Sequence, residues 1–227
     1  MNELQPLTID HYFQIMFNQN PYAGFDYQKF PLDLQGWGSD HPIFEQVLQN
    51  YQPKIIIEVG TWKGASAIHM AKLMRQQQKP CIIFCVDTWL GGIEHLSTYN
   101  DVLSLNPYRQ HGYPTLYHQF LANIMHEGLQ DMIVPFPNTS LIAARWFKRH
   151  NIQADLIYID ASHDEDDVYA DITNYWPLVS PNGVLLGDDW SEAWYGVICA
   201  VNRFAREKEL DIKVNNSKWA FLKQDNK

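Results

Sequence analysis

The amino-acid sequence predicts an α/β fold in which a mostly parallel sheet lies between two layers of helices. The main observation is a set of four apolar runs, each closed by glycine or an acidic residue: Lys54–Val59, Cys81–Val86, Asp155–Ile159 and Gly183–Leu186. Stretches of helical periodicity alternate with these runs. Strands that are apolar on both faces are typical of parallel sheets that helices cover on both sides.

Local signals place the elements of the first half. The apolar-periodic stretch Ile43–Tyr51 predicts a short helix after the loop GWGSDHP. Gly60 ends the first β-branched run, and Ala65–Arg75 then has helical periodicity until Pro80 stops it. The second apolar run ends at Asp87.

The second half continues the alternation but ends differently. A short strand and three helices are expected at Ile133–Phe136, Leu141–Arg149, Asp164–Trp176 and Trp190–Glu209. The last two runs, Asp211–Asn215 and Lys218–Lys223, are joined by a tight Asn-Ser turn with no helix between them. This pattern is typical of a hairpin, and it predicts that the final strand runs antiparallel to its neighbours.

Two segments lie outside the alternation. Residues 1–50 are rich in aromatic residues and turn formers, and we expect them to form a lid or cap on a domain that spans 51–227. Within that domain, residues 89–131 are too long for one βα unit and contain a helical piece at Phe120–Leu129. The length of this insert and its aromatic residues and histidines predict an ordered cap over the substrate.

The composition disfavours several classes of partner. The chain is 46% hydrophobic and carries a formal net charge of −9, which argues against nucleic acid and anionic membranes. No apolar run approaches the ~20 residues of a membrane span, and the start MNELQPLTID lacks the features of a secretory signal. Three cysteines without CxxC spacing predict buried free thiols in a cytoplasmic protein. The sequence does not decide between a monomer and a homo-oligomer.

Acidic residues stand at the ends of four expected strands. They are Glu58, Asp87, Asp160 and the pair Asp188-Asp189. Carboxyl ends of parallel strands share one edge of the sheet, where ligands bind in open α/β folds. We therefore expect these carboxylates to converge, although each alone is also typical of a helix cap or a turn.

The turn after the first strand indicates a nucleoside ligand that has no phosphates. A dinucleotide fold has its second glycine where this chain has Trp62, and a Trp would block a diphosphate there. Gly60 and Gly64 still permit a flexible turn before the helix amides. Asp87 is spaced to accept hydrogen bonds from ribose hydroxyls, with a turn cap as the alternative, and Trp89 either stacks on adenine or belongs to the core.

The remaining acids suggest a cation. Two carboxylates 4 Å apart repel each other by about 4 kcal/mol at an effective dielectric constant of 20, so Asp160, Asp188 and Asp189 would need a cation or a proton. An all-oxygen set selects a hard ion, and we expect Mg²⁺; the alternative is that Asp188 or Asp189 caps the next helix. His163 lies three residues after Asp160, and its unperturbed pKa near 6.5 suits a general base.

These motifs resemble a known family. EVGTWKGAS, IYIDASH and GVLLGDDW are similar to class I S-adenosylmethionine-dependent methyltransferases. The DxxH followed by GDD resembles metal-dependent O-methyltransferases related to the macrocin and mycinamicin sugar methyltransferases. The resemblance covers roughly residues 36–223. It implies a Rossmann-like seven-stranded sheet with an antiparallel last strand, Mg²⁺ on Asp160, Asp188 and Asp189, and His163 as the base.

The resemblance also implies which residues contact S-adenosylmethionine. We expect contacts from Glu58, Gly60, Thr61, Gly64, Ser66, Asp87, Thr88, Trp89, Ser140 and Asp160. Ser140 would lie near the adenine, although the acidic residue usual just before it is Thr139 here.

The implied reaction is methyl transfer to a hydroxyl of a small molecule, a sugar or a polyphenol. The aromatic insert would form the wall of the acceptor site, with Trp190 and Trp194 nearby. Two other classes stay open. Trp62 speaks against a nucleotide-binding oxidoreductase, and the intact Asp160, His163 and GDD motif speaks against a non-catalytic binding module on the same fold.

Overall fold

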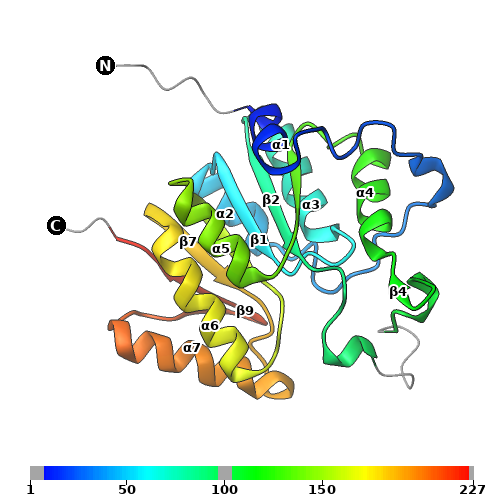
Figure 1. The fold of residues 1–227 in the computed structure, drawn as a ribbon. Coiled ribbons are helices and arrows are strands. Elements are labelled where there is room, and N and C mark those ends of the chain that lie inside the picture. Colours follow the sequence, from blue (N-terminus) through cyan, green and yellow to red (C-terminus); the bar gives the residue numbers. More distant parts are fainter. Residues whose placement is uncertain (1–7, 97–103, 225–227) are drawn as a thin grey trace.

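A seven-stranded sheet forms the centre of the molecule in the computed structural model, which describes residues 8–96 and 104–224 (Figure 1). The strand order is β5-β2-β1-β6-β7-β9-β8. Strands β1, β2, β5, β6 and β7 pair in parallel, and β9 pairs antiparallel with both β7 and β8. The strands are β1 (Ile55–Val59), β2 (Ile82–Asp87), β5 (Ile133–Pro137), β6 (Ala154–Ile159), β7 (Val179–Gly187), β8 (Lys213–Asn215) and β9 (Lys218–Leu222). The predicted sheet, including its antiparallel last strand, is confirmed.

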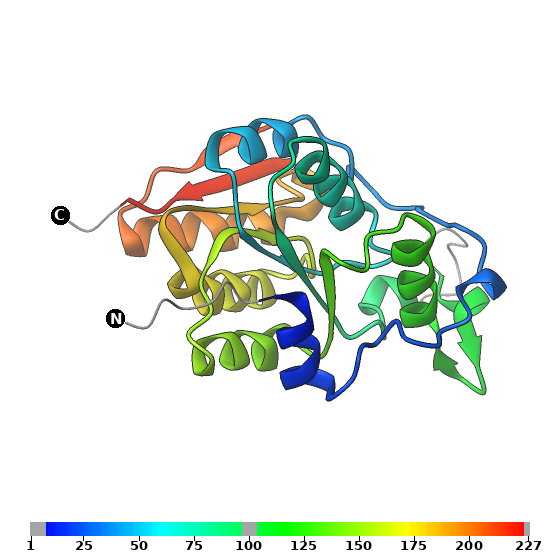
Figure 2. The same ribbon diagram turned by 90° about the horizontal axis from the view of Figure 1, so that it is seen from above.

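Helices cover both faces of the sheet, so the molecule has three layers (Figure 2). One face carries α2 (Ile43–Tyr51) and α3 (Ala65–Gln76). The opposite face carries four helices: α1 (Ile9–Phe17), α5 (Ser140–Arg149), α6 (Glu165–Tyr175) and α7 (Tyr195–Lys208). In the part of the chain that the structure describes, no helix is long and apolar enough to cross a bilayer.

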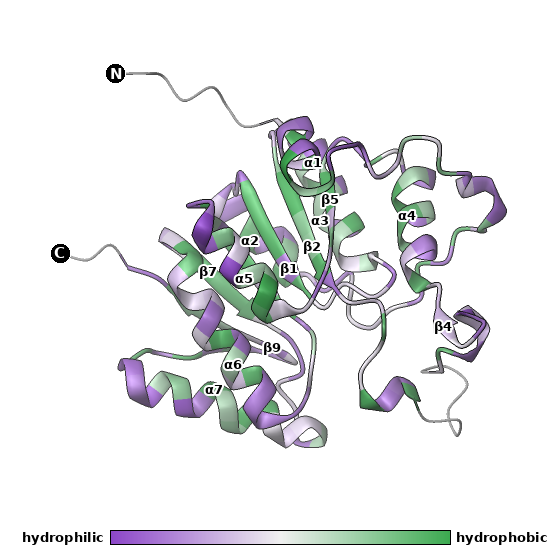
Figure 3. Ribbon diagram, viewed as in Figure 1, coloured by the Kyte–Doolittle hydropathy of each residue, from purple (hydrophilic) through white to green (hydrophobic). Residues whose placement is uncertain are grey.

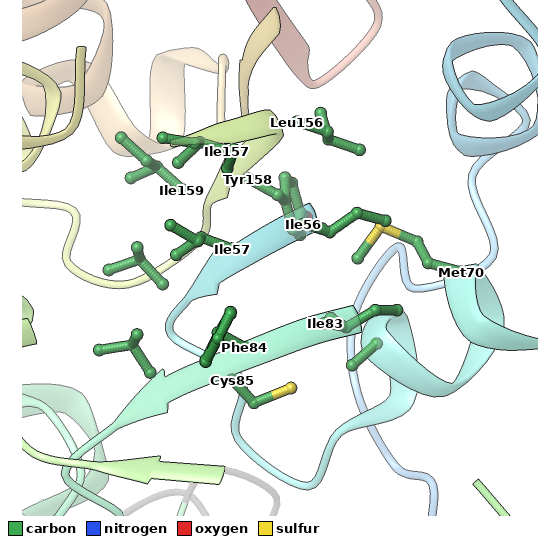
Figure 4. Packing of buried hydrophobic residues seen from close by; sticks show 14 of the residues in the cluster. Ile56, Ile57, Met70, Ile83, Phe84, Cys85, Leu156, Ile157, Tyr158 and Ile159 are labelled. Carbon is green, nitrogen blue, oxygen red and sulfur yellow. The ribbon is translucent and has the colours of Figure 1, made fainter. Parts of the chain in front are cut away.

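Side chains of adjacent strands pack in register on each face of the sheet. Ile56 of β1 pairs with Ile83 of β2 and Leu156 of β6, and Figure 4 shows Met70 of α3 reaching toward this row. On the other face Phe84 lies 5.1 Å from the ring of Phe147 in α5. This double burial explains the continuous apolar runs, and Figure 3 shows hydrophobic residues concentrated along the strands.

The amino-terminal segment differs from the expected lid. Helix α1 packs on the sheet through Tyr12, whose ring meets Phe84 edge-on at 4.8 Å, and through the buried Phe13. Tyr22 then donates a hydrogen bond to the carbonyl of Ile133 in β5. The first part of this segment is therefore core. Only the stretch after η1 (Tyr27–Lys29) crosses toward the carboxyl ends of the strands.

The insert contains α4 (Leu116–His126), η2 (Ile93–Leu96), η3 (Asn106–Tyr108) and a small hairpin of β3 (Arg109–Gln110) and β4 (Tyr113–Pro114). Its residues 97–103 lie outside the described residues.

The expected helix at 190–209 begins later than predicted, at Tyr195 after η5 (Glu192–Trp194). Asp189 has a φ of +63°, and the Trp190 amide donates to the carbonyl of Ser217, so the chain turns away before the helix can start. The short helix η4 (Trp176–Leu178) links α6 to β7.

Candidate functional site

A cavity of about 820 Å³ lies at the carboxyl ends of the parallel strands. Segments that follow β1, β2, β5, β6 and β7 all line it, and among the acids expected to converge there, Asp87, Asp160 and the pair Asp188-Asp189 line it while Glu58 does not. The amino-terminal segment and the start of the insert complete its wall: Gln35, Gly36, Trp37, Ser39 and residues 91–95. Nothing in the sequence patterns singled out Gln35, which binds both the Trp62 indole and the Lys63 ammonium at 3.2 Å.

Gly60 makes the turn after β1 possible. Its φ is +84°, and a Cβ atom there would lie 1.9 Å from the carbonyl oxygen of Asp160. Asp87 holds the same turn, because its Oδ2 accepts from the amides of Thr61 at 3.0 Å and Trp62 at 2.9 Å. Its Oδ1 accepts from the amide of Trp89 at 2.7 Å. The turn cap expected of Asp87 is therefore present. Asp87 also lines the cavity, and its contact with a ribose stays a prediction.

Glu58 lies behind the loop that follows β1, and its side chain does not line the cavity. It is fully buried, and its carboxylate accepts hydrogen bonds from Thr61 Oγ1 at 2.8 Å and from the Ser66 hydroxyl. Burial raises the pKa of Glu58 to about 7, although these hydrogen bonds oppose the shift. The expected direct contact with the cofactor is therefore corrected to a supporting role, because β1 turns this side chain toward the α2–α3 face.

Two other expected contacts belong to the packing behind the loop. A Cβ atom on Gly64 would meet the Phe120 ring at 2.9 Å, so this glycine permits close approach of α4. Trp89 is 2% exposed, packs 4.9 Å from the Phe120 ring and donates its indole N–H to the carbonyl of Trp62. Neither residue lines the cavity, which decides the open alternative for Trp89 in favour of the core.

The other expected cofactor residues do line the cavity: Gly60, Thr61, Ser66, Asp87, Thr88, Ser140 and Asp160. Ser140 opens α5, whose cap is the hydroxyl of Thr139. Asp171 of α6 lies beside Ser140 and was not anticipated. It is 6% exposed, it lines the cavity, and burial raises its pKa to about 6. The available signal was an acid between the apolar positions Val168 and Ile172.

His163 sits between two carboxylates. Its Nδ1 lies 2.7 Å from Glu94 Oε1, its Nε2 lies 3.1 Å from Asp189 Oδ2, and its ring stacks on Trp194 at 3.7 Å. Burial alone would lower the pKa of His163, but the hydrogen bonds to Asp189 and Glu94 outweigh it and raise the pKa to about 9. The expected value near 6.5 is therefore wrong for this environment, and the imidazolium is the main form at neutral pH.

Asp160 and Asp188 converge on one hydroxyl group. The Tyr158 oxygen lies 2.9 Å from Asp160 Oδ2 and 3.0 Å from Asp188 Oδ2. Lys218 of β9 contributes an ammonium group that contacts Asp188 Oδ2 and lies 2.7 Å from the Tyr158 oxygen. Burial, together with repulsion from Asp188 and Asp189, holds the pKa of Asp160 well above its usual range.

This arrangement does not fit the expected Mg²⁺ site. Mg²⁺ requires near-octahedral oxygen ligands at about 2.0–2.1 Å. Here Asp188 is paired with a lysine and Asp189 with His163. Within residues 8–96 and 104–224, no group of three or more His, Cys, Asp or Glu side chains is placed to hold a metal ion. The positive charge beside Asp188 and Asp189 thus comes from the chain itself.

The chain is similar to known methyltransferases in sequence and in fold. A family model described as a methyltransferase domain matches residues 57–190. A rhamnosyl O-methyltransferase of Mycobacterium bovis is 30% identical over 77 residues, which are 34% of this chain and 29% of that protein. An uncharacterised protein of Sinorhizobium fredii, y4gI, is 24% identical over 153 residues, which are 67% of this chain and 15% of that protein. The chain thus spans less than a third of the length of either relative.

Solved structures share the fold. The O-methyltransferase NovP superposes with a TM-score of 0.59 and 16% identity, covering 80% of this chain and 78% of its own. An O-methyltransferase from Bacillus cereus in complex with SAH gives a TM-score of 0.56 and 14% identity, covering 95% of this chain and 97% of its own.

Proposed function

The chain belongs to the methyltransferase-domain family, and from this premise we propose that it transfers the methyl group of S-adenosylmethionine to a hydroxyl of a small molecule, a sugar or a polyphenol. The observation that carries the proposal is the cavity, whose lining includes two chemically different sets of groups. The Gly60 turn, Asp87 and Ser140 suit an adenosine, whereas His163 offers a group that accepts a proton once it is neutral.

The donor supplies a methyl group already activated by a positively charged sulfur, so the protein has to position and deprotonate the acceptor. In-line positioning of the reacting atoms is worth about 7–11 kcal/mol. The acceptor oxygen forms the bond to the methyl carbon while the carbon–sulfur bond breaks and its electron pair stays on sulfur.

We assign proton acceptance to His163 Nε2. Glu94 orients the ring through Nδ1, so the neutral tautomer carries its proton on Nδ1 and presents Nε2 as the acceptor. The acceptor hydroxyl would replace Asp189 as the partner of Nε2. No step of the proposal runs through Mg²⁺, because Asp188 and Asp189 are already paired with Lys218 and His163.

Calorimetric titration with S-adenosylmethionine tests the donor assignment. We expect saturable binding, lost or weakened at least about tenfold in Asp87→Ala because the Gly60 turn loses its cap. Asp166→Ala is the matched control, since this exposed acid of α6 does not line the cavity. Tight binding of NAD in place of S-adenosylmethionine would overturn the proposal in favour of an oxidoreductase.

Radiolabelled methyl transfer to panels of sugars and polyphenols tests the acceptor. Label in an alkali-stable methyl ether supports hydroxyl methylation. Label only on amines or thiols, with the donor bound normally, would contradict the choice of acceptor atom while leaving the methyltransferase assignment intact.

A further inference from the structure

A buried lysine lies within the carboxylate cluster. Lys218 is the first residue of β9 and is 1% exposed. Its ammonium contacts Asp188 Oδ2, lies 2.7 Å from the Tyr158 hydroxyl and lies over the rings of Phe44 and Tyr158 at 5.3 and 5.0 Å. An ammonium group this deeply buried is unfavourable unless a partner compensates it, so Asp188 and Lys218 depend on each other.

We propose that the Lys218 ammonium is the resident cation of this cluster and, with the Tyr158 hydroxyl, takes the place that a divalent metal ion would need between Asp160 and Asp188. The Tyr158 oxygen lies 2.9 Å from one carboxylate and 3.0 Å from the other, which is the position of a bridging ligand. A metal ion there would have to displace both groups.

The oxygen atoms of Asp188 are already engaged. Oδ2 binds Lys218 and Tyr158, while Oδ1 accepts from the Asp189 amide at 2.8 Å and from the Ser217 hydroxyl at 3.1 Å. A carboxylate has about four lone-pair positions and Asp188 has four hydrogen-bonding neighbours, so a metal ion on Asp188 would compete with groups of the chain itself.

The hairpin before and within β9 is built to hold this lysine. The Trp219 indole donates a hydrogen bond to the Asp188 carbonyl at 2.9 Å, and the Ser217 carbonyl accepts one from the Trp190 amide at 2.8 Å. From the other side, a Cβ atom on Gly38 would lie 3.4 Å from the Lys218 ammonium, so the amino-terminal segment closes over it. Contacts on both sides of Lys218 thus fix the ammonium in place.

The role of the cluster in catalysis rests on the proposed function. Whether the Lys218 ammonium is the resident cation of the cluster can be tested without a methyl acceptor. The test is Mn²⁺ titration followed by electron paramagnetic resonance on the full chain. We expect no saturable Mn²⁺ site in the wild type. In Lys218→Met, one site should appear that binds at least about tenfold tighter than any wild-type signal, because a positive charge has left the carboxylates.

Two further variants identify the new site. Lys223→Met is the matched control, since Lys223 follows the same strand but donates to the carbonyls of Trp176 and Val179. It should bind Mn²⁺ as the wild type does. Asp188→Asn in the Lys218→Met background should remove the site.

Two results would overturn the proposal. One is a saturable Mn²⁺ site in the wild type that Asp188→Asn abolishes, which needs no folded Lys218 variant. The other is a folded Lys218→Met protein with no gain in Mn²⁺ binding. Neither result bears on S-adenosylmethionine binding, so the proposed function stands or falls separately.

Discussion

The protonation state of His163 follows from its two hydrogen-bond partners. A neutral imidazole has one N–H, whereas both ring nitrogens here face carboxylate oxygens, at 2.7 Å in Glu94 and 3.1 Å in Asp189. Both contacts are donor bonds only in the imidazolium. A histidine in this setting becomes a base only after it releases a proton. Its pKa of about 9 therefore sets the fraction of enzyme that holds a neutral base at a given pH.

A rising pH–rate profile is therefore expected. The base must be neutral, so the methyl-transfer rate at saturating donor should rise tenfold per pH unit and level off above about 9. Glu94→Gln removes one carboxylate, lowers the pKa of His163 and moves the rise to lower pH. Initial rates measured on either side of pH 9 check both statements. Glu192→Gln, an exposed change in η5, is the control, and an unmoved profile in Glu94→Gln would exclude His163 as the titrating base.

Two glycines with positive φ differ in what an added side chain would meet. Gly60 and Gly128 both have positive φ, +84° and +64°, but a Cβ atom meets backbone at 1.9 Å in the first and nothing within 4 Å in the second. Gly128→Ala should lower the free energy of unfolding by about 1–2 kcal/mol from backbone strain alone. Gly60→Ala should lower it by more than about 3 kcal/mol, because β1 and β6 must separate. Urea unfolding measures the two free energies of unfolding. Equal losses in both variants would show that the close approach of Gly60 to the Asp160 backbone adds nothing to the cost.

At the scale of elements, Asn123 of α4 ties three segments together. Its amide donates to the carbonyls of Asp33 at 2.7 Å and Lys63 at 2.9 Å, and its oxygen accepts from the Asp33 amide at 3.0 Å and from Gln119 at 2.9 Å. The Lys63 ammonium also pairs with Asp33 at 2.7 Å. The amino-terminal segment is thus fixed to the Gly60 loop through the insert.

Asn123→Ala should therefore destabilise the protein and weaken donor binding together. Asn123 is fully buried, and its removal leaves several buried backbone groups without a partner, at about 1–3 kcal/mol each. Asn202→Ala is the matched control, because Asn202 is also helical but exposed, with one hydrogen bond to the Ile198 carbonyl. It should change the unfolding free energy by less than about 0.5 kcal/mol. A loss of stability with unchanged affinity for S-adenosylmethionine would show that Asn123 does not position the donor site.

The same elements explain what the sequence could predict. Strands buried on both faces had to be continuous apolar runs, so β1, β2 and β6 were predictable, and their shared edge placed Asp87 and Asp160 correctly. Helix α1 was missed because its apolar face lies in a segment rich in turn formers. Lys218 was missed for a different reason: its pairing with Asp188 depends on β9 lying beside β7, a non-local contact that no local pattern encodes.

At the scale of the whole molecule, the amino-terminal segment lines the cavity, and the hairpin of β8 and β9 contacts an acid of its wall. Gly36 and Trp37 line it from the amino-terminal segment, and Gly38 and Lys218 cover the Asp188 carboxylate from opposite ends of the sequence. The fold thereby buries several acids away from water. Burial raises the pKa of Glu58 to about 7 and of Asp171 to about 6. These buried acids link global stability to pH.

Glu58 is one of the buried acids whose ionisation opposes folding. Its pKa is about 7 in the folded protein against an ordinary value of 4.5, so its stabilising contribution is complete below 4.5 and is lost as pH rises to about 7. The loss amounts to about 3 kcal/mol. Glu58→Gln keeps one oxygen acceptor, for either Thr61 or Ser66, places an NH2 donor beside the other hydroxyl, and cannot ionise. The variant should therefore gain about 3 kcal/mol of unfolding free energy relative to wild type between these two pH values. Urea unfolding at both ends of the interval measures it, with the exposed Glu45→Gln of α2 as control. If the difference between variant and wild type does not change with pH, Glu58 is not buried as a carboxylic acid and the loop rests on another support.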